Sequence, residues 1–334
     1  MEEGMTETNL PTDIESQVAS EIVSSPVSHQ QVKRDRIVIL GRTQAGKTVF
    51  MASLYDACWN RGGSVQIEAI DGRTHKAMME SIETLRAGKW PSSTTGVKYL
   101  DMMVTVDGQS RPLISVDYPG EVFRKAFIDG LETEDVQELL DHIDRAAAVI
   151  VLVDPNVVVN AVATVSMDDN YGMAKAIERI RSWPGGEDVP ISIVLTKSDK
   201  YQGQIDRYGG AVKFVRQYYP SLVQSASRSS VFQCSVVEVK TNGKTDSAVF
   251  RKFNSKGTVA PIHWIVNQLH EQELLRDATE KNRIRREMMV EAERLDEVNR
   301  ERSTKMWIIG WVSFIVAFFL VAFITFIVVW PTES

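Results

Sequence analysis

Residues 41–48 read GRTQAGKT and match the phosphate-loop pattern GxxxxGK[ST]. The two glycines permit a tight turn whose successive backbone N–H groups point inward and hold phosphate oxygens. The Lys47 ammonium would neutralise the β- and γ-phosphates. The Thr48 hydroxyl would bind Mg²⁺, which takes its remaining ligands from phosphate and water. We therefore expect a bound nucleotide to contact Gly41, Gln44, Ala45, Gly46, Lys47, Thr48 and Val49.

The surroundings of this loop suit its chemistry. It directly follows the apolar run RIVIL at 36–40 and opens the helical pattern TVFMASLYDAC at 48–58. A strand before the loop and a helix after it would present the helix N-terminus to the phosphates. A chance glycine loop is the alternative, and this context makes it the weaker interpretation.

A second signal lies at 112–120, PLISVDYPG, where an apolar strand ends in Asp117 and Gly120 follows three residues later. A carboxylate at such a strand end can hold Mg²⁺ through water. The Gly120 N–H can contact a γ-phosphate and respond to its loss. The DxxG pattern alone is weak, because any long chain contains matches to it.

The third signal concerns the base. Thr196, Lys197, Ser198 and Asp199 follow the apolar run ISIVL. The Asp199 carboxylate can accept two hydrogen bonds from guanine N1–H and its exocyclic amine, whereas adenine would present a lone pair at N1. The Lys197 stem can cover the face of the base. A polar turn at a strand end is the alternative, but the phosphate loop upstream favours guanine recognition.

A weaker signal follows at Cys234, Ser235 and Val236. A backbone N–H of Ser235 or Val236 could contact guanine O6. A plain buried strand would give the same sequence, so this assignment depends on the motifs before it.

The elements that must position these residues alternate along the chain. Short apolar runs, several of them apolar throughout, are separated by amphipathic helical patterns. This alternation predicts an α/β fold with a doubly wound, mainly parallel sheet and helices on both faces. The expected strands are 36–40, 65–70, 99–106, 112–116, 147–153, 191–195 and 231–237, and the expected helices are 48–60, 74–86, 132–143, 171–183, 212–219 and 261–275. The connection at 154–170 is long and apolar, which favours a packing insert over a partner-facing loop.

Composition excludes several function classes. The net charge of −6 over 334 residues, without a basic block, argues against nucleic acid as a partner. The two cysteines form no CxxC pair, and the five histidines are scattered. No HExxH or paired-carboxylate pattern is present, so a zinc site, a disulfide framework, a hydrolytic metalloenzyme of the HExxH kind and a glycosidase are not indicated.

The sequence predicts five segments. Residues 1–32 are polar and aperiodic, which is typical of a disordered tail. Residues 33–270 would form the nucleotide-binding domain. Residues 271–305 contain nine basic and ten acidic residues and no Gly or Pro, which predicts a charged helix. Its heptad pattern is interrupted, so both a solvated spacer and self-association through this helix stay open.

Residues 306–330 would form a transmembrane helix, followed by a short tail at 331–334. Residues 307–330 contain no charge, and about 1.5 Å per residue gives roughly 36 Å, enough to cross a hydrocarbon core of about 30 Å. Trp307, Trp311 and Trp330 mark the ends, as interfacial aromatics do. Basic residues precede the span, which predicts a tail-anchored protein of the inner membrane with its large domain in the cytoplasm.

The order GRTQAGKT, DYPG, TKSD and CSV resembles that of the translation-factor-like (TRAFAC) class of P-loop GTPases, over residues 32 to 275. Within that class the chain most resembles bacterial GTPases of the double-GTPase type linked to defence and conflict systems. The segments that carry this closer likeness are KWPSST at 89–94, DYPGE at 117–121 and GTVAPIHW at 257–264. The resemblance implies a Ras-like doubly wound core, binding of GTP or GDP with Mg²⁺, and two switch segments.

The resemblance also implies roles for residues outside the nucleotide motifs. Thr94, or its neighbour Thr95, would be the switch threonine that closes on Mg²⁺ and the γ-phosphate, acting with Lys47 in hydrolysis. Glu121 stands where Ras-like members have the glutamine that orients water. It could orient water or merely stabilise a helix N-terminus. Residues 87–98 contain no arginine, so we expect slow or partner-activated hydrolysis.

These observations favour a GTP hydrolase that acts as a switch at a membrane, with guanine nucleotide, membrane lipid and a protein effector or activator as its partners. Two alternatives stay open. One is a GTP-dependent receptor or scaffold that does not hydrolyse. The other is a membrane effector of a defence system, in which the span itself assembles.

Overall fold

The computed structural model describes residues 33–42, 44–59, 61–92, 98–117, 120–160, 163–225, 228–240 and 249–329. The chain divides into two compact units, one up to Leu269 and one from His270. The expected N-terminal tail, Thr94, Thr95, Trp330 and the short tail lie outside the described residues.

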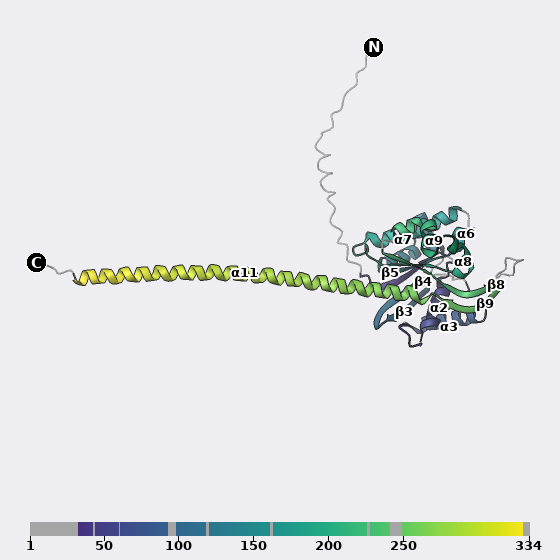
Figure 1. Ribbon diagram of the computed structural model, residues 1–334, viewed down its shortest axis with the longest axis horizontal. Helices are drawn as coiled ribbons and strands as arrows, with labels where there is room; N and C mark the ends of the chain where they lie inside the picture. Colours follow the sequence, from purple (N-terminus) through teal and green to yellow (C-terminus); the bar gives the residue numbers. More distant parts are fainter. Residues whose placement is uncertain are drawn as a thin grey trace, which may run out of the picture. The chain divides into compact units, whose positions relative to one another are not determined.

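The first unit is built on a seven-stranded sheet of order β2-β3-β4-β1-β5-β6-β7 (Figure 1). β1 lies at the centre, parallel to β4 on one side and to β5 on the other, and β6 and β7 continue the parallel part. β2 and β3 complete the sheet as antiparallel strands. The strands are β1 (Arg36–Gly41), β2 (Val65–Ala69), β3 (Lys98–Val106), β4 (Gln109–Asp117), β5 (Ala146–Val153), β6 (Ile191–Leu195) and β7 (Ser229–Gln233).

The central strands are buried on both faces because their side chains alternate between two hydrophobic cores. In β1, Ile37 and Ile39 enter one core, whereas Val38 and Leu40 enter the other. From Ala148 to Val153, the residues of β5 alternate in the same way. This arrangement explains why these strands are apolar throughout their length.

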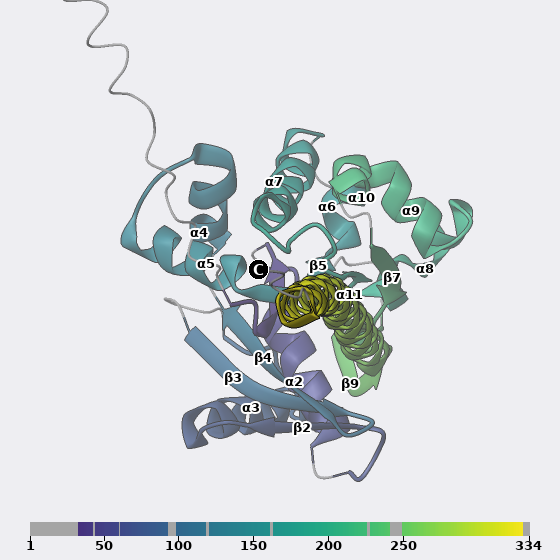
Figure 2. The same cartoon turned by 90° about the vertical axis from the view of Figure 1, so that its left-hand side faces the viewer.

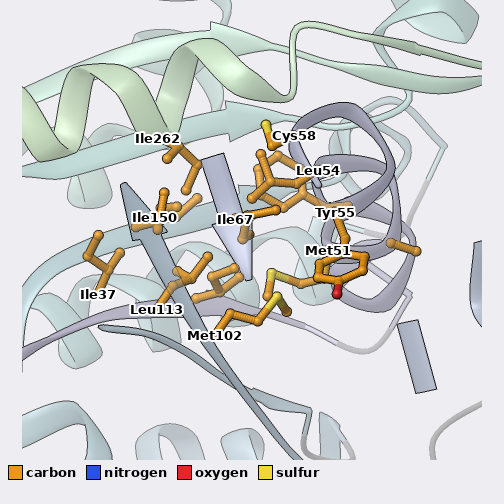
Figure 3. Close-up of a cluster of buried hydrophobic side chains, with 14 of the residues drawn as sticks. Ile37, Met51, Leu54, Tyr55, Cys58, Ile67, Met102, Leu113, Ile150 and Ile262 are labelled. Atoms are coloured by element: carbon orange, nitrogen blue, oxygen red, sulfur yellow. The ribbon is translucent and has the colours of Figure 1, made fainter. Parts of the chain in front are cut away.

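One face of the sheet is covered by α2 (Lys47–Cys58), α3 (Gly72–Arg86) and the first turns of α11. A separate two-stranded hairpin, β8 (Ser235–Lys240) and β9 (Val249–Lys256), packs on the same side. Figure 3 shows Met51 and Leu54 of α2, Ile67 of β2 and Ile262 of α11 among the buried side chains of this core.

The opposite face is covered by the remaining helices of this unit, and Figure 2 shows the two layers on either side of the sheet. A π-helical segment, η1 (Lys125–Asp129), follows α4 without a break. The helices are α4 (Gly120–Arg124), α5 (Glu134–Asp144), α6 (Pro155–Asn160), α7 (Ala163–Ser182), α8 (Ser198–Arg207), α9 (Ala211–Tyr218) and α10 (Pro220–Ser225).

This architecture confirms the predicted doubly wound, mainly parallel α/β fold. One expected strand is different: residues 231–237 do not form a single strand, because β7 ends at Gln233 and the chain leaves the main sheet to begin β8 at Ser235. The connection after β5 is helical, contributing α6 and the first turns of α7. The strand and helix expected between the phosphate loop and the first switch are β2, at the edge of the sheet, and α3.

α11 runs from Val259 to Val329. Its part in the second unit is charged at first and apolar afterwards. Within the described residues, it is the one helix long and apolar enough to cross a membrane, judged by length and composition. A core helix of a soluble protein can pass the same test, but none of the apolar window of α11 is buried.

Candidate functional site

The phosphate loop leaves the central strand at Gly41, which is closely packed against β5. A Cβ atom at this position would lie 3.1 Å from the Leu152 carbonyl oxygen and 3.2 Å from the Ala45 Cβ. Gln44 and Gly46 both have positive φ, 65° and 90°, so the chain turns sharply before α2 begins. The first helix bond runs from the Phe50 N–H to the Gly46 carbonyl at 2.7 Å. The strand, turn and helix required by the sequence pattern are therefore present in order.

Lys47 lies inside this loop and is only 6% exposed. Its ammonium donates hydrogen bonds to the carbonyl oxygens of Gly41, at 2.9 Å, and Arg42, at 3.2 Å. A cation held by backbone carbonyls can exchange these partners for phosphate oxygens, which form stronger charge-assisted bonds. Thr48 follows in the first turn of α2.

Lys197 connects the predicted base motif to the phosphate loop. Its ammonium donates to the Gln44 carbonyl at 2.9 Å and forms an ion pair with the Asp154 carboxylate at 2.5 Å. Lys197 has a φ of 52°, a left-handed conformation that non-glycine residues rarely adopt. Such a conformation persists only where surrounding contacts hold it in place. The two contacts of the ammonium are 153 and 43 residues away in sequence.

Asp154 is a site residue that the sequence motifs did not identify. It follows the last residue of β5, its side chain is 8% exposed, and it accepts a hydrogen bond from the Asn156 N–H at 2.9 Å. In the sequence, an Asp directly after the apolar run at 147–153 could have indicated a functional carboxylate at the end of a central strand. The same position in a sequence is also typical of a polar residue at a strand end, so the signal was ambiguous.

Thr196 and Ser198 anchor the base motif in the sheet. The Thr196 N–H and hydroxyl both donate to the Val153 carbonyl, at 2.9 and 3.2 Å. The Ser198 N–H and hydroxyl both donate to the Cys234 carbonyl, at 3.1 and 3.0 Å. The base motif is thereby tied directly to the Cys-Ser-Val segment, and the two form one structural unit.

A cavity of about 230 Å³ lies where these segments meet. Its walls combine α2, the base motif, the start of β8 and an aromatic residue from the segment after α3. The lining residues are Gly46, Val49, Phe50, Trp90, Thr196, Lys197, Asp199, Lys200, Cys234, Val236 and Val237. A mainly apolar wall with a few convergent polar groups is typical of a ligand site.

The polar end of the cavity carries Asp199, in the first turn of α8. Burial raises the pKa of this carboxyl group, and the nearby Glu238 also raises it, whereas Lys256 and backbone N–H groups lower it. Burial raises the pKa of the Cys234 thiol to about 12, so the thiol stays neutral. The carboxylate of Asp199 is partly desolvated, which favours a ligand that donates hydrogen bonds to it.

The predicted γ-phosphate and metal residues are described only in part. Asp117 ends β4, whose register with β1 is parallel, so its backbone reaches the same sheet edge as the phosphate loop. Gly120 begins α4, and Glu121 is exposed in its first turn. Thr94 lies outside the described residues. Among the described residues, no group of three or more His, Cys, Asp or Glu side chains could hold a metal ion. Mg²⁺ would thus need phosphate and water oxygens besides the Thr48 hydroxyl and a carboxylate.

The residues predicted from the phosphate loop, the base motif and the Cys-Ser-Val segment fall into three sets. Gly46, Val49, Thr196, Lys197, Asp199 and Val236 line the cavity, and Gly41, Gln44, Ala45, Lys47 and Thr48 form the adjoining loop and helix start. Ser235 is buried and does not line the cavity. Phe50, Trp90, Lys200 and Val237 line it although the sequence motifs assigned them no contact. Cys234 also lines it, although within its motif only Ser235 and Val236 were assigned a contact. In the sequence, Trp90 belongs to the KWPSST segment that carries the family likeness, but nothing in that segment indicated a contact with the base.

Comparison with known proteins gives a family match and structural likenesses. The Double-GTPase 2 family model matches residues 35–254. No curated protein matches the chain. A solved structure of Methanosarcina barkeri Roco2 RocCORdC bound to GDP is 16% identical, with a TM-score of 0.28. The match covers 60% of this chain and 43% of that one, so this chain spans less than half the length of that structure.

The family match covers well over half of the chain and includes the phosphate loop, the DxxG segment, the base motif and the start of β8. The sheet order, the helices on both faces and the loop between β1 and α2 agree with it. The chain belongs to the Double-GTPase 2 family and is a P-loop GTP-binding protein.

Proposed function

We propose that this protein binds Mg·GTP in the cavity between α2, α8 and β8, hydrolyses it to GDP and phosphate, and acts as a switch on a membrane. The observation that supports the proposal best is the convergence of Gly46, Lys197, Asp199 and Val236 on one cavity beside the phosphate loop. These residues come from three segments that are about 150 and 40 residues apart in sequence. A structural role alone gives no reason for their convergence on an open cavity.

The nucleotide would lie with its base at the α8 end and its phosphates at the start of α2. Asp199 would accept the guanine N1–H and amine hydrogen bonds, which removes the desolvation cost of its carboxylate. Lys47 would exchange the carbonyls of Gly41 and Arg42 for the β- and γ-phosphate oxygens. Thr48, Thr94 and Asp117 would provide the protein oxygens for Mg²⁺, directly or through water.

Trp90 gives a direct test of the base site. Its indole is 54% exposed and lines the cavity together with the Lys197 stem. Stacking of an aromatic ring on a base contributes about 1–3 kcal/mol. We expect Trp90→Ala to weaken GDP binding about tenfold in calorimetry. The matched control is Trp59→Ala, which removes another partly exposed tryptophan that is not in the cavity lining. Equal losses in both variants would contradict the base-site assignment.

Hydrolysis would depend on Lys47, Thr94 and Glu121. Glu121 is exposed at the start of α4, a position from which a carboxylate can orient water and also stabilise the helix N-terminus. We expect Glu121→Ala to slow single-turnover GTP hydrolysis at least tenfold, about 1.4 kcal/mol of transition-state stabilisation, without changing GTP affinity. A purely capping role would instead lower thermal stability and leave the rate unchanged. If an added partner protein speeds hydrolysis by the wild type, a positive charge that residues 87–98 do not provide is supplied by that partner.

The second unit would anchor this switch in the inner membrane, with the nucleotide-binding unit in the cytoplasm. Support comes from the exposed apolar segment of α11 and from the basic residues Arg300, Arg302 and Lys305 before it. An anchored protein would meet effectors that are themselves in the membrane.

The anchor predicts a simple fractionation result. The full chain should stay in the membrane pellet after alkaline carbonate and high-salt washes, because apolar burial rather than charge holds it there. A chain that ends at Lys305 should be soluble and should still bind GTP, because every nucleotide motif precedes α11. Release of the full chain by salt would contradict the anchor. Protection of the large unit from protease in sealed vesicles with the cytoplasmic side outward would contradict the orientation.

A further inference from the structure

Eight residues of α11 recur at alternating spacings of four and seven. They are Ile284, Met288, Leu295, Asn299, Met306, Gly310, Ala317 and Val321. None of the eight is charged, although 19 of the 35 residues at 271–305 are charged, and four of the eight lie in that stretch. The pattern continues without interruption from the charged part of the helix into its apolar part.

The spacings of four and seven add up to a repeat of 11 residues, which is about 3.67 residues per turn. This value is close to the 3.6 residues per turn of an α-helix, so all eight residues lie along one face of α11. The four residues of this pattern in the charged part do not follow the spacing of three and four that a heptad requires. An 11-residue repeat is typical of helices that wind around each other with a right-handed twist.

Apart from Asn299, the part of this face at 284–299 is apolar, and it is uncovered in the described second unit. Ile284, Met288 and Leu295 are 46%, 68% and 58% exposed. The intrahelical ion pairs use other positions: Arg283 contacts Glu280 at 2.6 Å and Glu287 at 3.1 Å. A solvated spacer helix has no need of an apolar stripe, so this face indicates a packing partner.

In the apolar part, the same face carries small residues. Apart from its two chain neighbours and the surrounding backbone of its own helix, Gly310 has no atom within 4 Å of the place where a Cβ would be, and Ala317 follows it on the same face. A shallow surface hollow of about 570 Å³ surrounds Gly310, and its rim includes Met306, Trp307 and Phe314. Small residues on one helix face allow a second helix to approach closely within a bilayer.

We propose that a second copy of this chain packs on this face, in parallel and in register. The membrane anchor proposed above gives both copies the same orientation and depth, so each of the eight residues meets its own equivalent. Asn299 supports this occupant, because two facing Asn side chains can hydrogen-bond across a two-fold axis and a single polar layer selects one register. A different partner would need a helix that continues from water into the membrane with matching spacing.

Disulfide formation between single introduced cysteines tests this pairing in the full chain. The two native cysteines, Cys58 and Cys234, are buried, so the wild type supplies the background. In membranes treated with a mild oxidant, we expect Leu295→Cys to give at least fivefold more dimer than Val290→Cys. Val290 is similarly exposed, at 55%, but lies on the opposite side of the helix. Asn299→Cys should behave like Leu295→Cys.

The membrane part has its own variant pair. Gly310→Leu should reduce the Leu295→Cys dimer at least threefold, whereas Val312→Leu, on another side of the helix, should leave it unchanged. Equal dimer formation by Val290→Cys and Leu295→Cys would overturn the proposal. So would the absence of dimer in both Leu295→Cys and Asn299→Cys, or a cross-linked product that is not a dimer of this chain. Carbonate extraction of the same membranes shows separately whether the anchor is present, and GTP binding shows whether the nucleotide-binding unit is folded.

Discussion

Lys47→Ala should reduce GTP affinity at least 100-fold, a loss of about 2.7 kcal/mol. The buried ammonium lies within the loop that would surround the phosphates, and it donates to the Gly41 and Arg42 carbonyl oxygens. The substitution removes this buried ammonium group, and with it the charge-assisted hydrogen bonds that it would form with the phosphates. Binding of a fluorescent GTP analogue to the purified variant measures the effect.

The control must separate lost binding from lost folding, because the Lys47 side chain also contacts the loop backbone. Lys213→Ala removes an exposed lysine of α9 and should leave GTP affinity unchanged. Circular dichroism and thermal unfolding without nucleotide should be similar for wild type and both variants. Wild-type GTP affinity in a folded Lys47→Ala variant would contradict the phosphate-loop assignment.

Asp199→Asn should change which base the protein prefers. An amide presents a donor where guanine N1–H and the exocyclic amine also donate, so GTP affinity should fall about 100-fold, or 2.7 kcal/mol. Xanthine carries an acceptor oxygen where guanine carries the amine, so the variant should bind XTP more tightly than the wild type does. Competition between GTP, XTP and ATP for the same site measures the base preference of the wild type and of the variant.

The matched control is Asp206→Asn in the same helix. Asp206 is exposed and accepts a hydrogen bond from Gln202 at 2.8 Å, away from the cavity lining. This variant should keep the wild-type preference for guanine. An unchanged preference in Asp199→Asn would show that another group reads the base.

The fold and much of the site were predictable because their determinants are local in sequence. The apolar runs of β1 and β5 indicate strands buried on both faces, and the loop between β1 and α2 is a continuous eight-residue pattern. The polar helix α8 was missed because SDKYQGQIDR contains only two large apolar residues, Tyr201 and Ile205, which are too few to show a helical repeat.

Long-range contacts account for most of the remaining differences. The carboxylate of Asp154 becomes recognisable as a site residue only through its ion pair with Lys197, 43 residues later. Trp90 lines the cavity from the segment after α3, about 100 residues before the base motif in the sequence. Between β7 and β8, the Cys234 N–H donates a hydrogen bond to the Leu195 carbonyl, and the Cys234 carbonyl accepts hydrogen bonds from Ser198. These partners are 36 or more residues away in sequence, so local sequence preferences could not predict the break.

The measurement that tests the central claim most directly is nucleotide selection by the purified wild-type protein. Calorimetric titration with GTP, GDP and ATP in the presence of Mg²⁺ compares all three ligands at one site. We predict one molecule of GTP or GDP bound per chain and at least 100-fold weaker binding of ATP, because adenine presents an acceptor to the Asp199 carboxylate. Equal binding of ATP and GTP, or no binding of any of the three, would contradict the account.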